Sequence, residues 1–187
     1  IEIGLIQDEV SSVAYFHEVL EMLLLRFELP ILKRMMQSYD HEVEFQQWAE
    51  IYRASRESKE LLAESQQLAF SLNAWIRDVL KRPVQVKKQY GFVPVYAQLC
   101  GELHLDVEDV LTAYTFTVLE NQVLAAVKTV PLGQMSGQRI LWALHEHVPR
   151  VIQEAMKLSD DDLSSALPHY AMLSMQHETQ YSRLFRS

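Results

Sequence analysis

The apolar residues of this chain recur mostly every three or four positions, which is the spacing of one face of an α-helix. In the segment VSSVAYFHEVLEMLLLRF, residues 10–27, the series consists of Val10, Val13, Phe16, Leu20, Leu23 and Leu24. Neither glycine nor proline occurs between Ile31 and Arg82, and so long a stretch without turn residues favours helices over strands. The pattern therefore predicts an all-α fold.

Turn and cap residues divide this pattern into helices. After a first helix over 10–27, Pro30 is expected to open a second one, because proline fits the first helical position. The further helices are expected at about 42–54, 58–80, 92–103, 107–130 and 134–156, with a short one after Ser159. Asp106 is the expected N-cap of the helix from 107, and Pro83 is expected to stop the helix before the segment KRPVQVKKQYG.

No pair of segments carries the chemistry of a β-hairpin. A chain of 187 residues can bury one substantial core, so we predict a single domain over residues 1–187. The expected architecture is a bundle of about seven to ten helices, with residues 177–187 as a C-terminal interaction tail.

Composition and charge exclude some classes of function. The net charge is -8 and the pI is near 5.3, which disfavours a general nucleic-acid-binding role. No uninterrupted apolar run approaches the roughly 20 residues that span a bilayer, so no membrane association is expected. A single cysteine, Cys100, cannot form an internal disulfide, which fits the reducing cytoplasm or simply a protein that uses no disulfides.

The motifs of common catalytic and cofactor sites are missing from the sequence. The glycine pair in GQMSG, residues 133–137, lacks the Lys-Ser/Thr of a phosphate loop; its spacing instead indicates a close approach of two segments. The pair His145 and His147 does not complete HExxH, because residue 149 is proline. We assign no catalytic residue, no cofactor and no metal site.

Cys100 and His104 are the one pair whose spacing, i and i+4, would suit two ligands on one helical face. Structural metal sites use about four ligands, so a lone pair of this kind is more often structural.

The second half of the helix from 107 is interrupted by the polar residues ENQ, 120–122, and ends near Lys128. At 100° per residue, Asn121 and Lys128 fall on nearly the same face, and Glu120 lies about 80° from Lys128. Lys128 can serve to neutralise the C-terminus of the helix, or these residues can form a polar patch that meets another protein. Spacing alone favours the first interpretation.

The chain ends in HETQYSRLFRS, residues 177–187, which is unusually aromatic and cationic for a terminus. Tyr181 and Phe185 are anchors of the kind enriched in interfaces, and Arg183 and Arg186 can form charge-assisted hydrogen bonds. The composition predicts that this tail is buried against something, either a partner or the chain's own helices.

Two segments, ENQVLAAVKTVPLGQMSGQRIL (120–141) and HETQYSRLFRS, resemble the urease accessory protein UreF family. RESKELLAESQQLA (56–69) resembles the R-x-T/S-R/K-E-L segment of this family, and the initial IEIGLI resembles the text after its Gly-Leu-Glu motif. The resemblance covers essentially the whole chain. The family usually begins with F/Y-S-x-S-x-GLE, and this chain starts just beyond that point.

The resemblance implies an all-helical, dimeric scaffold without enzymatic activity of its own. It implies assembly with UreD (UreH in some bacteria) and the GTPase UreG on apo-urease, where nickel is inserted and GTP hydrolysis by UreG is regulated. It also implies that Lys128, with Glu120 and Gln134, faces UreG, and that UreD/UreH binds the tail through Tyr181, Arg183, Phe185 and Arg186.

Two alternatives stay open at this point. One is a direct GTPase-activating protein that inserts an arginine into UreG, for which Arg53, Arg56 and Arg139 are the conceivable donors. The other is a nickel-binding chaperone that uses Cys100 and His104.

Overall fold

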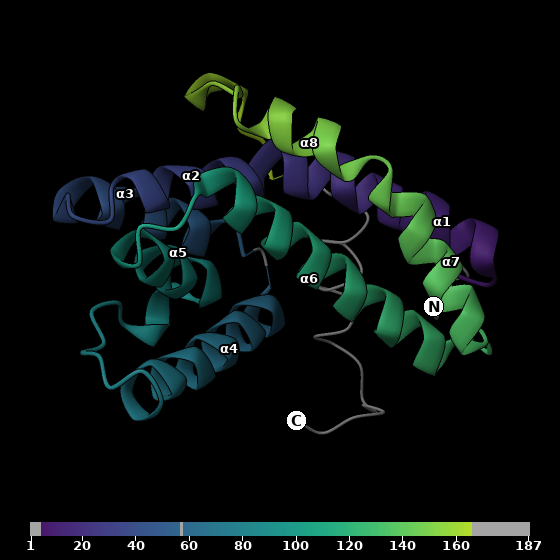
Figure 1. Cartoon of the computed structure of the whole chain (residues 1–187), viewed down its shortest axis with the longest axis horizontal. Helices are drawn as coiled ribbons and strands as arrows, with labels where there is room; N and C mark the ends of the chain where they lie inside the picture. Colours follow the sequence, from purple (N-terminus) through teal and green to yellow (C-terminus); the bar gives the residue numbers. More distant parts are fainter. Residues whose placement is uncertain (1–4, 57, 166–187) are drawn as a thin grey trace. The chain divides into compact units, whose positions relative to one another are not determined.

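The structure is a computed structural model that describes residues 5–56 and 58–165 (Figure 1). No strand occurs in these two ranges, and the prediction of an all-α fold is confirmed. In chain order the elements are α1 (Glu9–Glu18), η1 (Val19–Glu28), α2 (Leu29–Gln37), α3 (Glu42–Ala54), α4 (Lys59–Asp78), η2 (Lys88–Tyr90), α5 (Phe92–Glu102), α6 (Val107–Thr129), α7 (Gln134–His145), α8 (Val148–Ala155) and η3 (Asp160–Asp162).

Contacts within the chain define two compact units. The first unit comprises the described residues up to 33 and from 105 to 165, and the second comprises the described residues from 34 to 104. The prediction that residues 1–187 form a single domain stays a prediction.

The second helix expected at Pro30 is present as α2, which begins at Leu29, but it follows η1 without a break. The chain stays helical from Glu9 to Gln37, because η1 is a π-helix in which the bonds span five residues, as in Leu29 N–H to the Leu24 carbonyl. Pro30 has no N–H to offer the Arg26 carbonyl four residues earlier. The N–H of Ser164 donates to that carbonyl instead, at 3.1 Å.

The core of the first unit lies where α6 packs against α1, α7 and α8. The apolar face of α1 and η1 contributes Phe16, Leu20 and Leu24, as the spacing predicts, but Val10 is 78% exposed and was wrongly expected in this face. From α6 the buried residues are Val110, Leu111, Tyr114, Thr115, Leu119, Val123 and Ala126. The Tyr114 hydroxyl donates to the buried Glu28 carboxylate at 2.8 Å.

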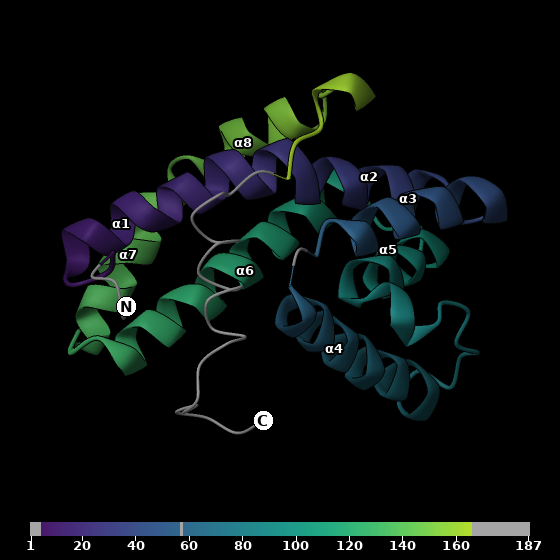
Figure 2. The same ribbon diagram turned by 180° about the vertical axis from the view of Figure 1, so that it is seen from behind.

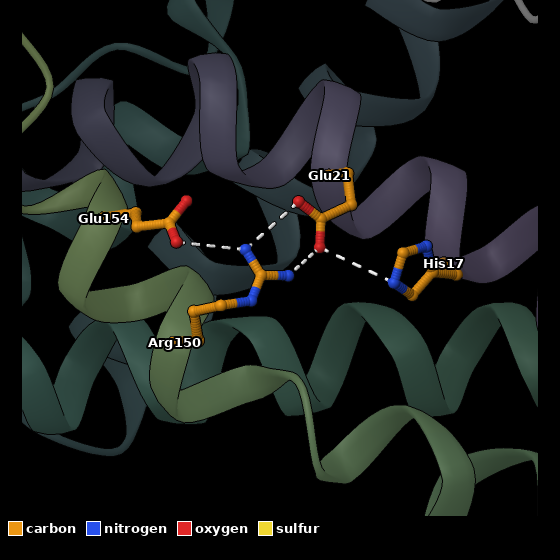
Figure 3. A network of polar contacts seen from close by, with 4 residues as sticks. All are labelled: His17, Glu21, Arg150 and Glu154. Atoms are coloured by element: carbon orange, nitrogen blue, oxygen red, sulfur yellow. Dashed lines mark hydrogen bonds and ion pairs between the residues drawn. The ribbon is translucent and has the colours of Figure 1, made fainter.

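A polar network joins α8 to η1 at the surface of the first unit (Figure 3). The Arg150 guanidinium donates to Glu21 and, at 3.2 Å, to Glu154, and His17 Nε2 lies 3.6 Å from Glu21. Because these groups are partly exposed, each pair adds little to stability.

In the second unit α4 packs along α5, as both views of the fold show (Figure 2). Gly91 precedes α5 with a φ of 92°, a conformation that favours glycine, and a Cβ there would lie 2.5 Å from Ser65 Oγ. Ser65 Oγ accepts the N–H of Phe92 at 2.9 Å and bonds Tyr52 at 3.3 Å. The hydrogen bond from Phe92 to Ser65 connects the start of α5 to α4.

α4 ends before the expected stop at Pro83. Its last residue is Asp78, and Lys81 follows with a φ of 56°. The helix therefore terminates through a left-handed residue, and Pro83 belongs to the extended segment that leads to η2.

α6 is the one helix in the described part of the chain that is long and apolar enough to cross a membrane, by length and composition only. Its most apolar 18-residue window has a mean hydropathy of 1.2 and is 39% buried. Its sequence is not an uninterrupted apolar run, because it contains the charged residues Glu108, Asp109, Glu120 and Lys128. The packing of α6 against three neighbouring elements is that of a core helix.

Candidate partner-binding face

Lys128 lies in the last turn of α6, and its side chain is exposed. Its ammonium group makes no hydrogen bond or ion pair with any residue that the structure describes. A cation in this place is favourable for the partial negative charge of the helix C-terminus. Both interpretations of Lys128 are compatible with this position, and the exposed ammonium is accessible to a binding partner.

Glu120 and Lys128 share one exposed side of α6. They are eight residues apart, so about 12 Å of helix separates them, and Leu124 lies between them at the i+4 position from Glu120. All three side chains are exposed, Leu124 to 46%. We call Glu120, Leu124 and Lys128 the Lys128 face.

The Lys128 face has one exposed apolar residue between two opposite charges. Leu124 was not among the residues predicted from the sequence for this face. Leu124 follows Glu120 by four residues, and this spacing in the sequence indicates that both lie on the same side of the helix.

Gln134 lies beyond the turn that follows α6. Val130 adopts an extended conformation and ends the helix, the Leu132 N–H donates to the Val130 carbonyl at 2.6 Å, and Gln134 begins α7 with an exposed side chain. The next residue, Met135, is 68% exposed. The structure thus brings Glu120 and Lys128 onto one face and places Gln134 six residues after Lys128, at the start of the next helix.

The glycine pair in GQMSG has one constrained member. Gly133 has a φ of -71° and nothing lies within 4 Å of a Cβ built on it, so neither its backbone conformation nor its surroundings require glycine. At Gly137 a Cβ would meet Val127 Cγ2 at 2.9 Å and Val123 Cγ1 at 3.6 Å. The expected close approach therefore occurs at Gly137, where α7 packs on the last turns of α6 and positions the Lys128 face.

Cys100 and His104 do not share a helical face, and this expectation is wrong. α5 ends at Glu102, and His104 has a left-handed φ of 53°, with its ring edge-on to Tyr39 at 5.8 Å. Burial raises the pKa of the Cys100 thiol to about 11, so it is protonated near neutral pH and a poor metal ligand. Among the described residues no group of three or more His, Cys, Asp or Glu side chains could hold a metal ion.

Each arginine considered as a donor to a GTPase is engaged within its own unit. Arg139 forms a bidentate pair with Glu9, with Nε–Oε1 at 2.9 Å and a terminal nitrogen to Oε2 at 2.7 Å. Arg53 lies 3.3 Å from Glu50, and Arg56 covers the Tyr52 ring at 4.5 Å. No contact selects one of them for insertion into a partner.

The four tail residues Tyr181, Arg183, Phe185 and Arg186 lie outside the described residues. Their proposed contacts remain predictions.

The fold and the Lys128 face indicate the class of protein: an all-helical protein whose candidate site is an exposed surface suited to binding another protein. Comparison with known proteins specifies this class. The UreF family model matches residues 6–145. A urease accessory protein UreF of Nitrosospira multiformis is 38% identical over 195 residues, which cover the whole chain and 86% of that protein.

Further relatives agree with this match. A urease accessory protein UreF of Chromohalobacter salexigens is 38% identical over the whole chain and 83% of that protein. A bifunctional urease accessory protein UreEF of Bordetella bronchiseptica is 36% identical over the whole chain and 46% of that longer protein. The chain belongs to the UreF family of urease accessory proteins.

Proposed function

We propose that this protein is a non-enzymatic scaffold of urease maturation in the cytoplasm. It acts as a homodimer that joins UreD (UreH) and the GTPase UreG on apo-urease, promotes nickel insertion and regulates GTP hydrolysis by UreG. Membership of the UreF family, together with an exposed, unpaired Lys128 among the described residues, carries this proposal.

Lys128 contributes to UreG binding as a point charge. Its ammonium has three donors and, on the described surface, no acceptor that would have to be displaced. Docking to an acidic edge of UreG would therefore break no existing ion pair of Lys128. Leu124 adds apolar contact area beside it, and Glu120 and Gln134 help to select the orientation of the partner.

Replacement of Lys128 by alanine tests this role. Lys128→Ala should keep the helical circular dichroism of the wild type, because the side chain is exposed, and should weaken recruitment of UreG and activation of apo-urease with UreD, nickel and bicarbonate. Lys157→Ala is the matched control, since Lys157 is also an exposed lysine of the first unit. Unchanged recruitment and activation with Lys128→Ala would contradict the role of this residue.

The tail carries the second proposed contact, with UreD/UreH. Deletion of residues 177–187 should abolish co-purification with UreD, because it removes two aromatic anchors and two arginines together. Substitution of Arg183 and Arg186 by glutamine is a milder test that keeps the length of the chain. Full retention of UreD by the deletion variant would refute this part of the proposal.

A further inference from the structure

A groove of about 540 Å³ lies in the second unit, between α3 and residues 79–87, which join α4 to η2 and which we call the joining segment (Figure 1). The turn before α3, η2 and α5 also contribute to its lining. Its volume is within the range of about 300 to 1,000 Å³ that is typical of ligand sites. The groove shares no residue with the Lys128 face, which belongs to the first unit.

The floor of this groove is apolar apart from one amide. Phe45 and Ala49 of α3 and Val86 of the joining segment are buried. Gln98 of α5 is only 8% exposed, and its Nε2 donates to Glu102 at 3.0 Å. The side-chain carbonyl oxygen of Gln98 accepts no hydrogen bond from any residue that the structure describes. Because a buried amide oxygen without a donor is unfavourable, the floor is suited to a ligand that brings an N–H or O–H group.

The joining segment offers main-chain donors beside this floor. Lys87 is extended, with a φ of -69° and a ψ of 139°, and the Val86 carbonyl accepts a hydrogen bond from Asn73 Nδ2 at 3.1 Å. The N–H groups of Gln85, Val86 and Lys87 donate to no residue in the described part of the chain. An extended segment whose N–H groups are free can pair with the main chain of a second extended segment, as in recognition by strand addition.

Amide and phenol side chains complete the lining. Gln46 Nε2 donates to the Tyr90 hydroxyl at 3.1 Å and thereby links α3 to η2. This leaves the Gln46 carbonyl as an acceptor and the Tyr90 hydroxyl proton as a donor for a ligand. Each residue of a peptide main chain carries one N–H donor and one C=O acceptor, so a lining of both kinds matches it.

The charges of the lining disfavour other large ligands. Asp40 and Glu42 lie on the α3 side of the groove, and Lys87 lies on the side of the joining segment. A nucleic acid or an anionic membrane surface would bring its phosphates close to the two carboxylates. An uncharged peptide main chain meets no such repulsion. The lining therefore favours a peptide over these two classes of ligand.

We propose that this groove binds a short extended peptide segment of another protein. The segment lies along residues 85–87 and accepts hydrogen bonds from their free N–H groups, and one of its own N–H groups donates to the Gln98 carbonyl. One of its apolar side chains packs on Phe45 and Val86. This inference goes beyond the proposed function and does not rest on it, because neither Lys128 nor the tail takes part.

The test begins with random heptapeptides displayed on phage and selected on the full chain; the selected peptides are then synthesised and titrated by fluorescence anisotropy. Lys87→Pro is the decisive variant, because proline fits a φ of -69° but has no N–H. It should bind the selected peptides at least about tenfold more weakly, as expected for the loss of one hydrogen bond together with its desolvated acceptor. Lys87→Gln is the matched control: it removes the same charge but keeps the N–H, and it should bind like the wild type.

Two further readouts keep the test independent of a single variant. Gln98→Leu removes the acceptor in the floor and should also weaken binding, and thermal melting of each variant separates a loss of binding from a loss of folding. Methylation of the main-chain nitrogens of a selected peptide keeps its side chains and removes its donors, so the methylated peptide should not bind the wild type.

The peptide site is refuted if the library yields no peptide that binds the full chain, or if the selected peptides bind both groove variants as tightly as the wild type. It is equally refuted if the methylated peptides bind as tightly as the unmethylated ones, because the main chain then makes no contribution. Any of these results leaves the proposed function standing.

Discussion

Tyr114→Phe removes a single oxygen from the core of the first unit. The hydroxyl of Tyr114 donates to the Glu28 carboxylate at 2.8 Å, and both residues are buried, at 7% and 5% exposed. The ring remains in place, so no large cavity forms. The cost comes from a buried carboxylate that loses one of its donors.

A hydrogen bond to a charged group contributes about 1.5 to 3 kcal/mol, and Glu28 keeps a further interaction when the hydroxyl is removed. We therefore expect Tyr114→Phe to lower the free energy of unfolding by about 1 to 3 kcal/mol. In the Glu28→Gln variant the side-chain amide can still accept a hydrogen bond from the Tyr114 hydroxyl but carries no charge. Tyr114→Phe should therefore lower the free energy of unfolding less in the Glu28→Gln variant than in the wild type.

Urea unfolding followed by circular dichroism at 222 nm measures these differences, with the double-mutant cycle giving the coupling between the two side chains. Tyr90→Phe is the matched control: its hydroxyl bonds Gln46 at an exposed site, and the expected change is within about 0.5 kcal/mol. A Tyr114→Phe variant as stable as the control would refute the assignment of this bond as a core contact.

Other predictions concern packing, reactivity and charge. Gly137→Val should lower the melting temperature by several degrees because its side chain collides with α6, whereas Gly133→Ala should leave it unchanged; equal melting temperatures would contradict the packing. The raised pKa of Cys100, caused by burial, predicts slow modification of its thiol by a disulfide reagent at pH 8 in the folded protein and fast modification in urea; equal rates would contradict this. The Arg139 guanidinium donates to Glu9 and lowers the pKa of that carboxyl. The pair therefore stabilises the fold fully at pH values above the ordinary glutamate pKa of about 4.3, and this stabilisation is lost as the pH falls through the lowered pKa. Arg139→Gln should accordingly be less stable than the wild type at pH 7 and equal to it in strong acid, and a difference that persists in acid would point to another cause.

Local signals in the sequence predicted much of the fold. The helix of residues 42–54 was expected at the bounds of α3, and Asp106 caps α6 by accepting the Asp109 N–H at 3.0 Å. These features depend on periodicity and on a cap within four residues, which a sequence displays directly. The expected helix over 134–156, in contrast, is divided into α7 and α8 around Glu146 and His147, with Pro149 in the first turn of α8.

The features that sequence reasoning missed depend on contacts between distant segments. Pro30 is accommodated because η1 is a π-helix and Ser164 supplies the donor that proline lacks, which no local pattern reveals. Glycine is required at position 137 but not at position 133 because Gly137 lies on the side of α7 that contacts α6. Lys128 and Glu120 were identified as site candidates through a family resemblance, and the outward position of Leu124 between them required the structure.

The central claim is that this protein is a scaffold that binds its partners together. Size-exclusion chromatography with light scattering tests it most directly, applied to the full chain alone, with UreD, and with UreD and UreG. We expect a homodimer alone, a larger complex with UreD, and a still larger one that contains all three proteins when UreG is added. Separate elution of the three proteins, each at its own mass, would contradict the account.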